Sequence, residues 1–543
     1  MSALCWPPGI FRLLSGRASY NRFAHGASVS TISRRHGAVR NFSSYPHHRS
    51  PTAGNAQAIT FLTAAPVTPA VEQITSYFAS LLPIVNHTRV VPVIFASTFC
   101  APLIDPTQSS LGEIVNSLFG RIHAGNPPAV AYTVTAVVDK IAGNTGYAAN
   151  GEVFTHQAPQ GREGLSLLLA DATGVTARGT KPTRTRGAAS EEPAFILSTM
   201  PDAGKGALSH EVGLRLANTI FVNGKDRTLM GMKWNFDAQS QRYVLDKCRD
   251  LGVCSVGLSQ NPLQCSINIP LMPVTPPRRV VSSMGNILRQ VSKSLESTAD
   301  AHPASADLEK ELPRYVSSLG VPHQRVSVWA LVEPAESARP VQEWSAQQLE
   351  EAVSRGARLH RVMSGGGGWG KKQGLLSLDP EISFRDEKVS RTEAPVQQVL
   401  DRDEHATDLD SSSDVAEILD LSLEENIATL SQIAKEGDYI QFFVETPSAK
   451  KAIDESLVET QSQAFSATFA VAAPSDISPG AVGDAGENAH DPERNLSVLL
   501  NCFGGLSETA ITYRLKGDAA DFQRSTKLSM PGAQVELKLL STS

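Results

Sequence analysis

Acidic residues are absent from the first 71 positions of the chain, and the first carboxylate belongs to Glu72. The same stretch contains seven arginines and no lysine. An arginine- and serine-rich segment without acids is typical of a mitochondrial presequence, because the inner-membrane potential draws positive charge into the matrix. Arg40, Phe42 and Ser43 match a matrix-peptidase pattern of arginine, any residue, aromatic residue and small residue. We therefore expect cleavage before Ser43 and a mature protein in the mitochondrial matrix; the alternative is a basic tail.

Cysteine is scarce, and none of the six cysteines is spaced as Cys-x-x-Cys. Cys248, Cys254 and Cys265 lie nearest to one another but have no histidine beside them, so reduced thiols are expected rather than a zinc site. Long apolar runs are also missing. The longest candidate, residues 90–104, contains two prolines and is too short to span a membrane.

Known catalytic signatures are missing as well. The sequence contains neither Gly-x-Ser-x-Gly nor His-Glu-x-x-His, so we expect no catalytic residues and no cofactor.

The chain carries 49 basic and 55 acidic residues, and it becomes more acidic when the six arginines before Ser43 are removed. This charge balance disfavours binding of nucleic acid by the overall charge of the protein, but it is compatible with a local basic patch. One such patch lies in residues 173–190, expected to be a mobile loop, and consists of Arg178, Lys181, Arg184 and Arg186.

Strand-like and helix-like patterns alternate along the chain, which predicts an α/β or α+β fold with an N-terminal mixed sheet. Helices are expected over residues 67–81, 111–122, 346–356 and 414–437. Strands are expected over residues 58–63, 90–96, 129–138, 165–170, 194–199, 253–258, 265–269, 326–332, 359–363, 439–444, 496–500, 510–515 and 535–539.

Changes in composition predict the domain boundaries. A linker at residues 43–57 follows the presequence (residues 1–42), and residues 386–413 form an acidic linker. The expected folded parts are an α/β domain (58–283), a helical connector (284–312), a smaller glycine-loop unit (313–385) and a C-terminal α+β region (414–543).

The most unusual stretch is a glycine-rich loop that fits Gly-x-x-x-x-Gly-Lys, the spacing of a phosphate-binding P-loop. Lys372 stands where that loop needs a hydroxyl for Mg²⁺, and Gly374 and Pro380 interrupt the helix that should follow. We therefore expect no nucleotide hydrolysis. Two interpretations stay open: a loop that contacts an anion or an RNA backbone, and a structural turn. The residues concerned are Gly365, Gly366, Gly367, Gly368, Trp369, Gly370, Lys371 and Lys372.

Asp139 directly follows the apolar strand expected at residues 129–138. Ligand contacts in α/β sheets gather where strands end, so Asp139 is a candidate ligand contact. The other interpretation is a turn residue.

Two motifs support a resemblance to a known family. The first runs Gly161-Arg162-Glu163-Gly164 into the leucine-rich residues 165–169, and the second is Gly-Val-Cys-Ser-Val-Gly-Leu-Ser at residues 252–259. Their order resembles the N-terminal half of the FIST domain, named for F-box and intracellular signal transduction proteins, over residues 58–275. The resemblance implies a small-ligand-sensing module, with amino acids among the expected ligands, and no catalysis. The loop at 173–190 is extra, and nothing after Pro273 resembles the family's C-terminal half.

The leading hypothesis is thus a non-catalytic mitochondrial matrix protein with a FIST-like sensory or scaffold domain. Residues 359–379 also resemble uncharacterised fungal mitochondrial proteins, to which no function is attached. The main alternative is a factor that binds mitochondrial RNA or the ribosome through the loops at 173–190 and 364–372. A phosphate-ligand enzyme is the third hypothesis. The expected partner is accordingly a small ligand in the first case and RNA or the ribosome in the second.

Overall fold

All residues that the computed structural model describes belong to one compact unit within Arg49–Ser543. The expected presequence, which includes Arg40 and Phe42, lies outside the described residues, and so does Ser43. The described residues are 57–63, 68–81, 90–122, 127–143, 146–147, 153–154, 160–180, 192–199, 208–218, 228–259, 262–318, 326–336, 344, 346–365, 374–385, 393–402, 432–446, 464–473, 496–517 and 523–540.

The described residues form a mixed α and β structure that is mostly strands, which confirms the expected fold class. Within them, one sheet contains 18 strands and a second contains eight. No helix in the described part of the chain is both long and apolar enough to cross a membrane.

The N-terminal part of the large sheet is built around a parallel strand pair. β2 (Val90–Ser97) lies parallel to β3 (Val130–Val138), and the helix α2 (Ser109–Ile122) connects them. β7 (Gln160–Asp171) pairs antiparallel with β2 and with β1 (Ala58–Thr63), so β1 and β2 run in the same direction. β1 spans the residues that the sequence predicts.

Helices α1 (Val71–Ser76) and α2 cover one face of this sheet. The apolar residues of α2 recur every three or four positions, and this spacing places them on one buried stripe. They are Leu111, Ile114, Val115, Leu118, Phe119 and Ile122. The helix expected at 67–81 is shorter than predicted, because its last turn is the 3₁₀ helix η1 (Tyr77–Ser80).

The rest of the N-terminal region adds further strands. A long hairpin joins β11 (Leu229–Asp237) to β12 (Arg242–Leu258), and β11 also pairs with β3. The other elements are η2 (Ala101–Ile104), β4 (Lys140–Gly143), β5 (Gly146–Tyr147), β6 (Val153–Phe154), η3 (Ala172–Gly174), β8 (Val175–Gly179), β9 (Ala194–Thr199), β10 (Ser209–Arg215) and β13 (Pro262–Asn268).

The C-terminal strands complete this same sheet, so the separate region expected at 414–543 is wrong. β24 pairs with β1, β25 with β4, β26 with β10 and β28 with β13. Local sequence pattern cannot reveal such pairings, because the partners lie several hundred residues apart. The bounds are β23 (Ala464–Val471), β24 (Leu496–Leu500), β25 (Cys502–Ser507), β26 (Ile511–Lys516), β27 (Gln523–Leu528) and β28 (Gln534–Leu540).

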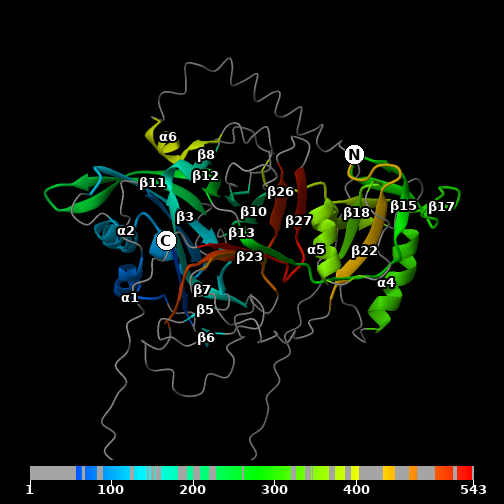
Figure 1. Cartoon of the computed structure of the whole chain (residues 1–543), viewed down its shortest axis with the longest axis horizontal. Helices are drawn as coiled ribbons and strands as arrows, with labels where there is room; N and C mark the ends of the chain where they lie inside the picture. The colour runs from blue at the N-terminus through cyan, green and yellow to red at the C-terminus, as the bar shows by residue number, and fades with distance from the viewer. Residues whose placement is uncertain are drawn as a thin grey trace, which may run out of the picture. The chain divides into compact units, whose positions relative to one another are not determined.

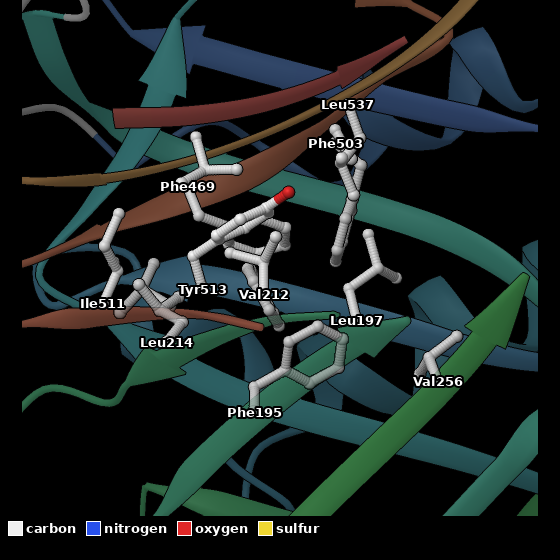
Figure 2. Close-up of a cluster of buried hydrophobic side chains, with 14 of the residues drawn as sticks. Phe195, Leu197, Val212, Leu214, Val256, Phe469, Phe503, Ile511, Tyr513 and Leu537 are labelled. Carbon is white, nitrogen blue, oxygen red and sulfur yellow. The ribbon is translucent and has the colours of Figure 1, made fainter. Parts of the chain in front are cut away.

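Aromatic side chains from both ends of the chain meet in the main core. Phe195 of β9, Phe469 of β23 and Phe503 of β25 lie in the same cluster (Figure 2). The ring of Phe95 on β2 lies 4.8 Å from that of Phe195 and 4.6 Å from that of Phe503. Burial of large aromatic rings is a major source of stability, so the N-terminal and C-terminal strands depend on each other.

Eight described strands within residues 271–446 form the second sheet, which closes into a small barrel, and in the sequence they lie between β13 and β23 of the large sheet. Its described strands follow the order β22, β15, β16, β20, β19, β18 and close because β18 also pairs with β22. The strands are β14 (Leu271–Pro273), β15 (Arg278–Met284), β16 (Ile287–Ser292), β17 (Ala301–Pro303), β18 (Val328–Glu333), β19 (Arg358–Gly365), β20 (Leu376–Leu378) and β22 (Tyr439–Glu445). Figure 1 shows β15, β18 and β22 with the two helices α4 (Ala306–Ser318) and α5 (Ala346–Arg355).

The barrel corrects two expected boundaries. The helical connector at 284–312 contains β16 and β17, with α4 only at its end, because Leu288 and Val291 are buried in the barrel core. The unit at 313–385 is not separate, since β22 from beyond the acidic segment completes it. The barrel is attached to the large sheet by buried contacts: Trp329 Nε1 donates to Ser529 Oγ over 3.1 Å.

The expected acidic linker at 386–413 is also wrong in part. β21 (Ala394–Pro395) pairs with β8, and α6 (Val396–Asp401) follows it. Val396 and Leu400 are fully buried, and this apolar burial fixes the segment to the sheet despite its charged neighbours. The helix expected at 414–437 falls mostly outside the described residues.

Candidate functional site

Several polar side chains meet at one edge of the large sheet, where strands that run in the same direction end. Thr63, Ser97 and Asp139 lie at the carboxyl ends of β1, β2 and β3, and Glu163 lies near the start of β7 at the same edge. In open α/β sheets, ligands bind at the carboxyl ends of parallel strands. We call Ser97, Cys100, Asp139, Lys140 and Glu163 the edge site.

Two glycines of the Gly161-Arg162-Glu163-Gly164 motif shape this edge. Gly164 has a φ angle of +152°, and a Cβ there would lie 1.9 Å from the carbonyl oxygen of Phe61. At Gly161, a Cβ would lie 2.6 Å from the Cβ of Lys140. Glycine is therefore required at both positions. Gly164 allows β7 to approach β1 closely, and Gly161 leaves room for the aliphatic part of the Lys140 side chain.

Lys140 and Glu163 form an ion pair at the centre of the edge site, from Nζ to Oε1. Their side chains are only 20% and 15% exposed. The second carboxylate oxygen of Glu163, Oε2, is buried and accepts no hydrogen bond from any described residue. A buried carboxylate oxygen without a donor is costly, so this atom favours an additional donor at the edge.

Ser97 and Cys100 lie beside this pair. Ser97 Oγ accepts a hydrogen bond of 3.0 Å from the backbone nitrogen of Gly164. Cys100 is fully buried, and burial raises the pKa of its thiol to about 11. The thiolate is the nucleophilic form of cysteine, so Cys100 is a neutral thiol near pH 7.

Asp139 lies at the bend between β3 and β4 with a side chain that is 7% exposed. Its Oδ2 accepts a hydrogen bond of 2.7 Å from the backbone nitrogen of Glu508. Burial raises the pKa of Asp139 to about 6. The residue is thus both a turn residue and a buried acid whose charge changes near neutral pH.

Lys140, Asp139, Glu163 and Ser97 bring an ammonium group, two carboxyl groups and a hydroxyl to this edge of the sheet, and all four residues are largely buried. This set can bind a small polar molecule that carries both donors and acceptors. It does not form a nucleophile with an adjacent general base, because Cys100 is protonated. The described residues also contain no group of three histidine, cysteine or acidic side chains that could hold a metal ion.

The glycine-rich loop differs from a P-loop in its surroundings. Gly365 ends β19, the following residues through Gln373 lie outside the described residues, and β20 then pairs antiparallel with β19. A P-loop leads from a strand into a helix, whereas this segment joins two strands of a hairpin. A Cβ at Gly365 would lie 2.2 Å from Leu376 Cδ2, so a side chain here would require Leu376 to shift.

The basic loop begins later than expected. Arg178 belongs to β8 and lies opposite Val253 of β12, while Val175 and Ala177 are buried. Because these apolar side chains enter the core, residues 173–179 are ordered rather than part of a mobile loop. Lys181, Arg184 and Arg186 lie outside the described residues.

The sequence analysis named Asp139 as a candidate ligand contact but did not name Ser97, Cys100, Lys140 or Glu163. Two signals pointed to them. Glu163 lies inside the motif that carries the family resemblance, and Lys140 follows Asp139 directly after an apolar strand. Nothing in the sequence indicates that Asp139-Lys140 and the motif with Glu163 lie at the same edge of the sheet.

The chain matches no family model, no curated protein and no solved structure.

Proposed function

We propose that this chain is a non-catalytic protein of the mitochondrial matrix that binds a small polar ligand at the edge site, within a FIST-like domain. The observation that carries the proposal is the Lys140–Glu163 pair, held between Gly161 and Gly164 where the strands end. The matrix location rests on the presequence pattern alone.

The charges of the edge site favour a ligand with both an amino and a carboxyl group. Glu163 Oε2 and the carboxyl group of Asp139 accept hydrogen bonds from an amino group, and Lys140 attracts a carboxylate. This ligand class agrees with the amino acids that the family resemblance implies. The absence of an activated nucleophile at the edge favours binding over turnover.

Ligand-induced thermal stabilisation of the mature chain tests the proposal. A binding ligand raises the melting temperature, so we expect at least one standard amino acid to do so in the wild type. We expect Glu163→Gln and Lys140→Met to weaken that binding by more than about tenfold, the usual scale for a hydrogen bond to a charged group. The matching amine and the matching acid, each without one group, should bind less tightly.

Lys233→Met is the matched control, because Lys233 is 23% exposed and ion-paired to Asp401 away from the edge site. This variant should respond to the ligand like the wild type. The proposal fails if no amino acid stabilises the wild type, or if Glu163→Gln responds as strongly as the control.

A further inference from the structure

A cavity of about 570 Å³ opens on the barrel beside β22. It arises where the neighbouring strand is interrupted: β14 pairs with Phe443 to Glu445, and β15 pairs with Tyr439 and Ile440. Residues 274–277, between β14 and β15, do not belong to a strand.

The wall of this cavity is held in place by hydrogen bonds. Thr275 Oγ1 accepts from the backbone nitrogen of Phe442 over 3.1 Å, and Gln441 Nε2 donates to the carbonyl oxygen of Thr275 over 2.6 Å. Gln441 Oε1 in turn accepts from Trp344 Nε1 over 2.8 Å. Pro276 and Pro277 restrict the backbone further. A wall fixed before binding loses little entropy when a ligand enters.

The charge of the cavity has one sign. Among the described residues, Arg278 and Lys293 are the charged side chains that line it, and no acidic side chain does so. Arg278 binds Asp307 through Nε and Nη2. Lys293 is exposed and forms no ion pair with a described residue. Val274, Leu295 and three prolines add apolar groups, while polar groups make up more than half of the exposed lining.

We infer that this cavity binds a small organic anion, with a carboxylate, phosphate or sulfonate on an apolar body. The anionic group pairs with Lys293 at the rim, and the apolar body contacts Val274, Pro277 and Leu295. The site is separate from the edge site and does not depend on the proposed function.

Fluorescence titration of the mature chain with anilinonaphthalene sulfonate tests this inference, because the probe combines an aromatic body with a sulfonate. We expect saturable binding that weakens as salt rises. Lys293→Glu should weaken it by about three- to fivefold, at the upper end of the scale for an exposed charge interaction, and Lys293→Arg should retain it. Phenylnaphthylamine, which has the same aromatic body without the sulfonate, should bind less tightly.

Lys310→Glu is the matched control, because Lys310 is an exposed lysine of α4 that does not line the cavity. This variant makes the same charge change in the same barrel and should bind the probe within about twofold of the wild type. The inference is overturned if the wild type shows no saturable binding, if both lysine variants behave alike, or if the neutral probe binds as tightly as the sulfonate.

Discussion

At the scale of single residues, burial decides the ionisation of the most informative groups. Burial raises the pKa of Asp139 to about 6 and that of Cys100 to about 11. It has the opposite effect on a base: the pKa of His360 falls to about 4. Burial disfavours the charged form of every group, so it raises the pKa of an acid and lowers the pKa of a base.

His360 should make the protein less stable in mild acid. Its side chain is 2% exposed, and Nδ1 lies 2.8 Å from the carbonyl oxygen of Asp379. Between pH 6.5 and about 4, the unfolded chain holds the proton and the folded chain does not. Its contribution to the free energy of unfolding should therefore fall with decreasing pH, by about 1.4 kcal/mol per pH unit.

Urea unfolding of the wild type and His360→Gln across this pH range isolates that contribution, because all other titrating groups are shared. The glutamine amide can still donate to Asp379, but it does not titrate. We expect the wild type to lose more stability than the variant as the pH falls. Parallel curves would contradict the role assigned to His360.

At the scale of elements, close approach between strands explains the glycine motif. Gly164 lies in β7 with a φ angle of +152°, which L side chains rarely adopt, and its Cα faces the backbone of Phe61. Gly112 is different: a Cβ there would meet nothing within 4 Å, and the residue lies inside α2. The same substitution should thus have opposite effects at the two positions.

We expect Gly164→Ala to destabilise the protein by more than about 1 kcal/mol, because its Cβ would overlap the carbonyl oxygen of Phe61. The control Gly112→Ala should stabilise it by about 0.5–1 kcal/mol, since alanine favours helix. Denaturant midpoints of the two variants measure both effects. A neutral Gly164→Ala would mean that β7 and β1 do not approach as closely as described.

At the scale of the whole molecule, the expected presequence and the described residues do not overlap in sequence. The described residues begin at Gln57, beyond the expected cleavage before Ser43. Cleavage there would remove six arginines and none of the described residues. Targeting can therefore be tested without changing a residue of either proposed binding site.

Import of the full chain into isolated mitochondria should yield a matrix protein that begins at Ser43. Arg40→Ala should prevent processing at this position, because the peptidase pattern depends on that arginine, whereas Arg22→Ala should not. N-terminal sequencing of the imported protein provides the measurement. An imported chain that still begins at Met1, or a wild type that is not protected from added protease, would exclude the expected cleavage.

Local pattern in the sequence determined the elements with a strong apolar period. β1, α2 and β9 lie where the pattern predicts them, because their burial depends on residues within a few positions of one another. The mixed fold class follows from the same patterns. Asp139 was also identified in this way, since the end of an apolar strand is visible in the sequence.

Only the tertiary structure decided how these elements combine. The pairing of β24 with β1 joins residues more than 400 positions apart, and the barrel closes through β22 from beyond an acidic segment. The edge site likewise brings Lys140 of β4 to Glu163 of β7. Such contacts depend on strand order, and strand order is set by burial over the whole sheet rather than by neighbouring residues.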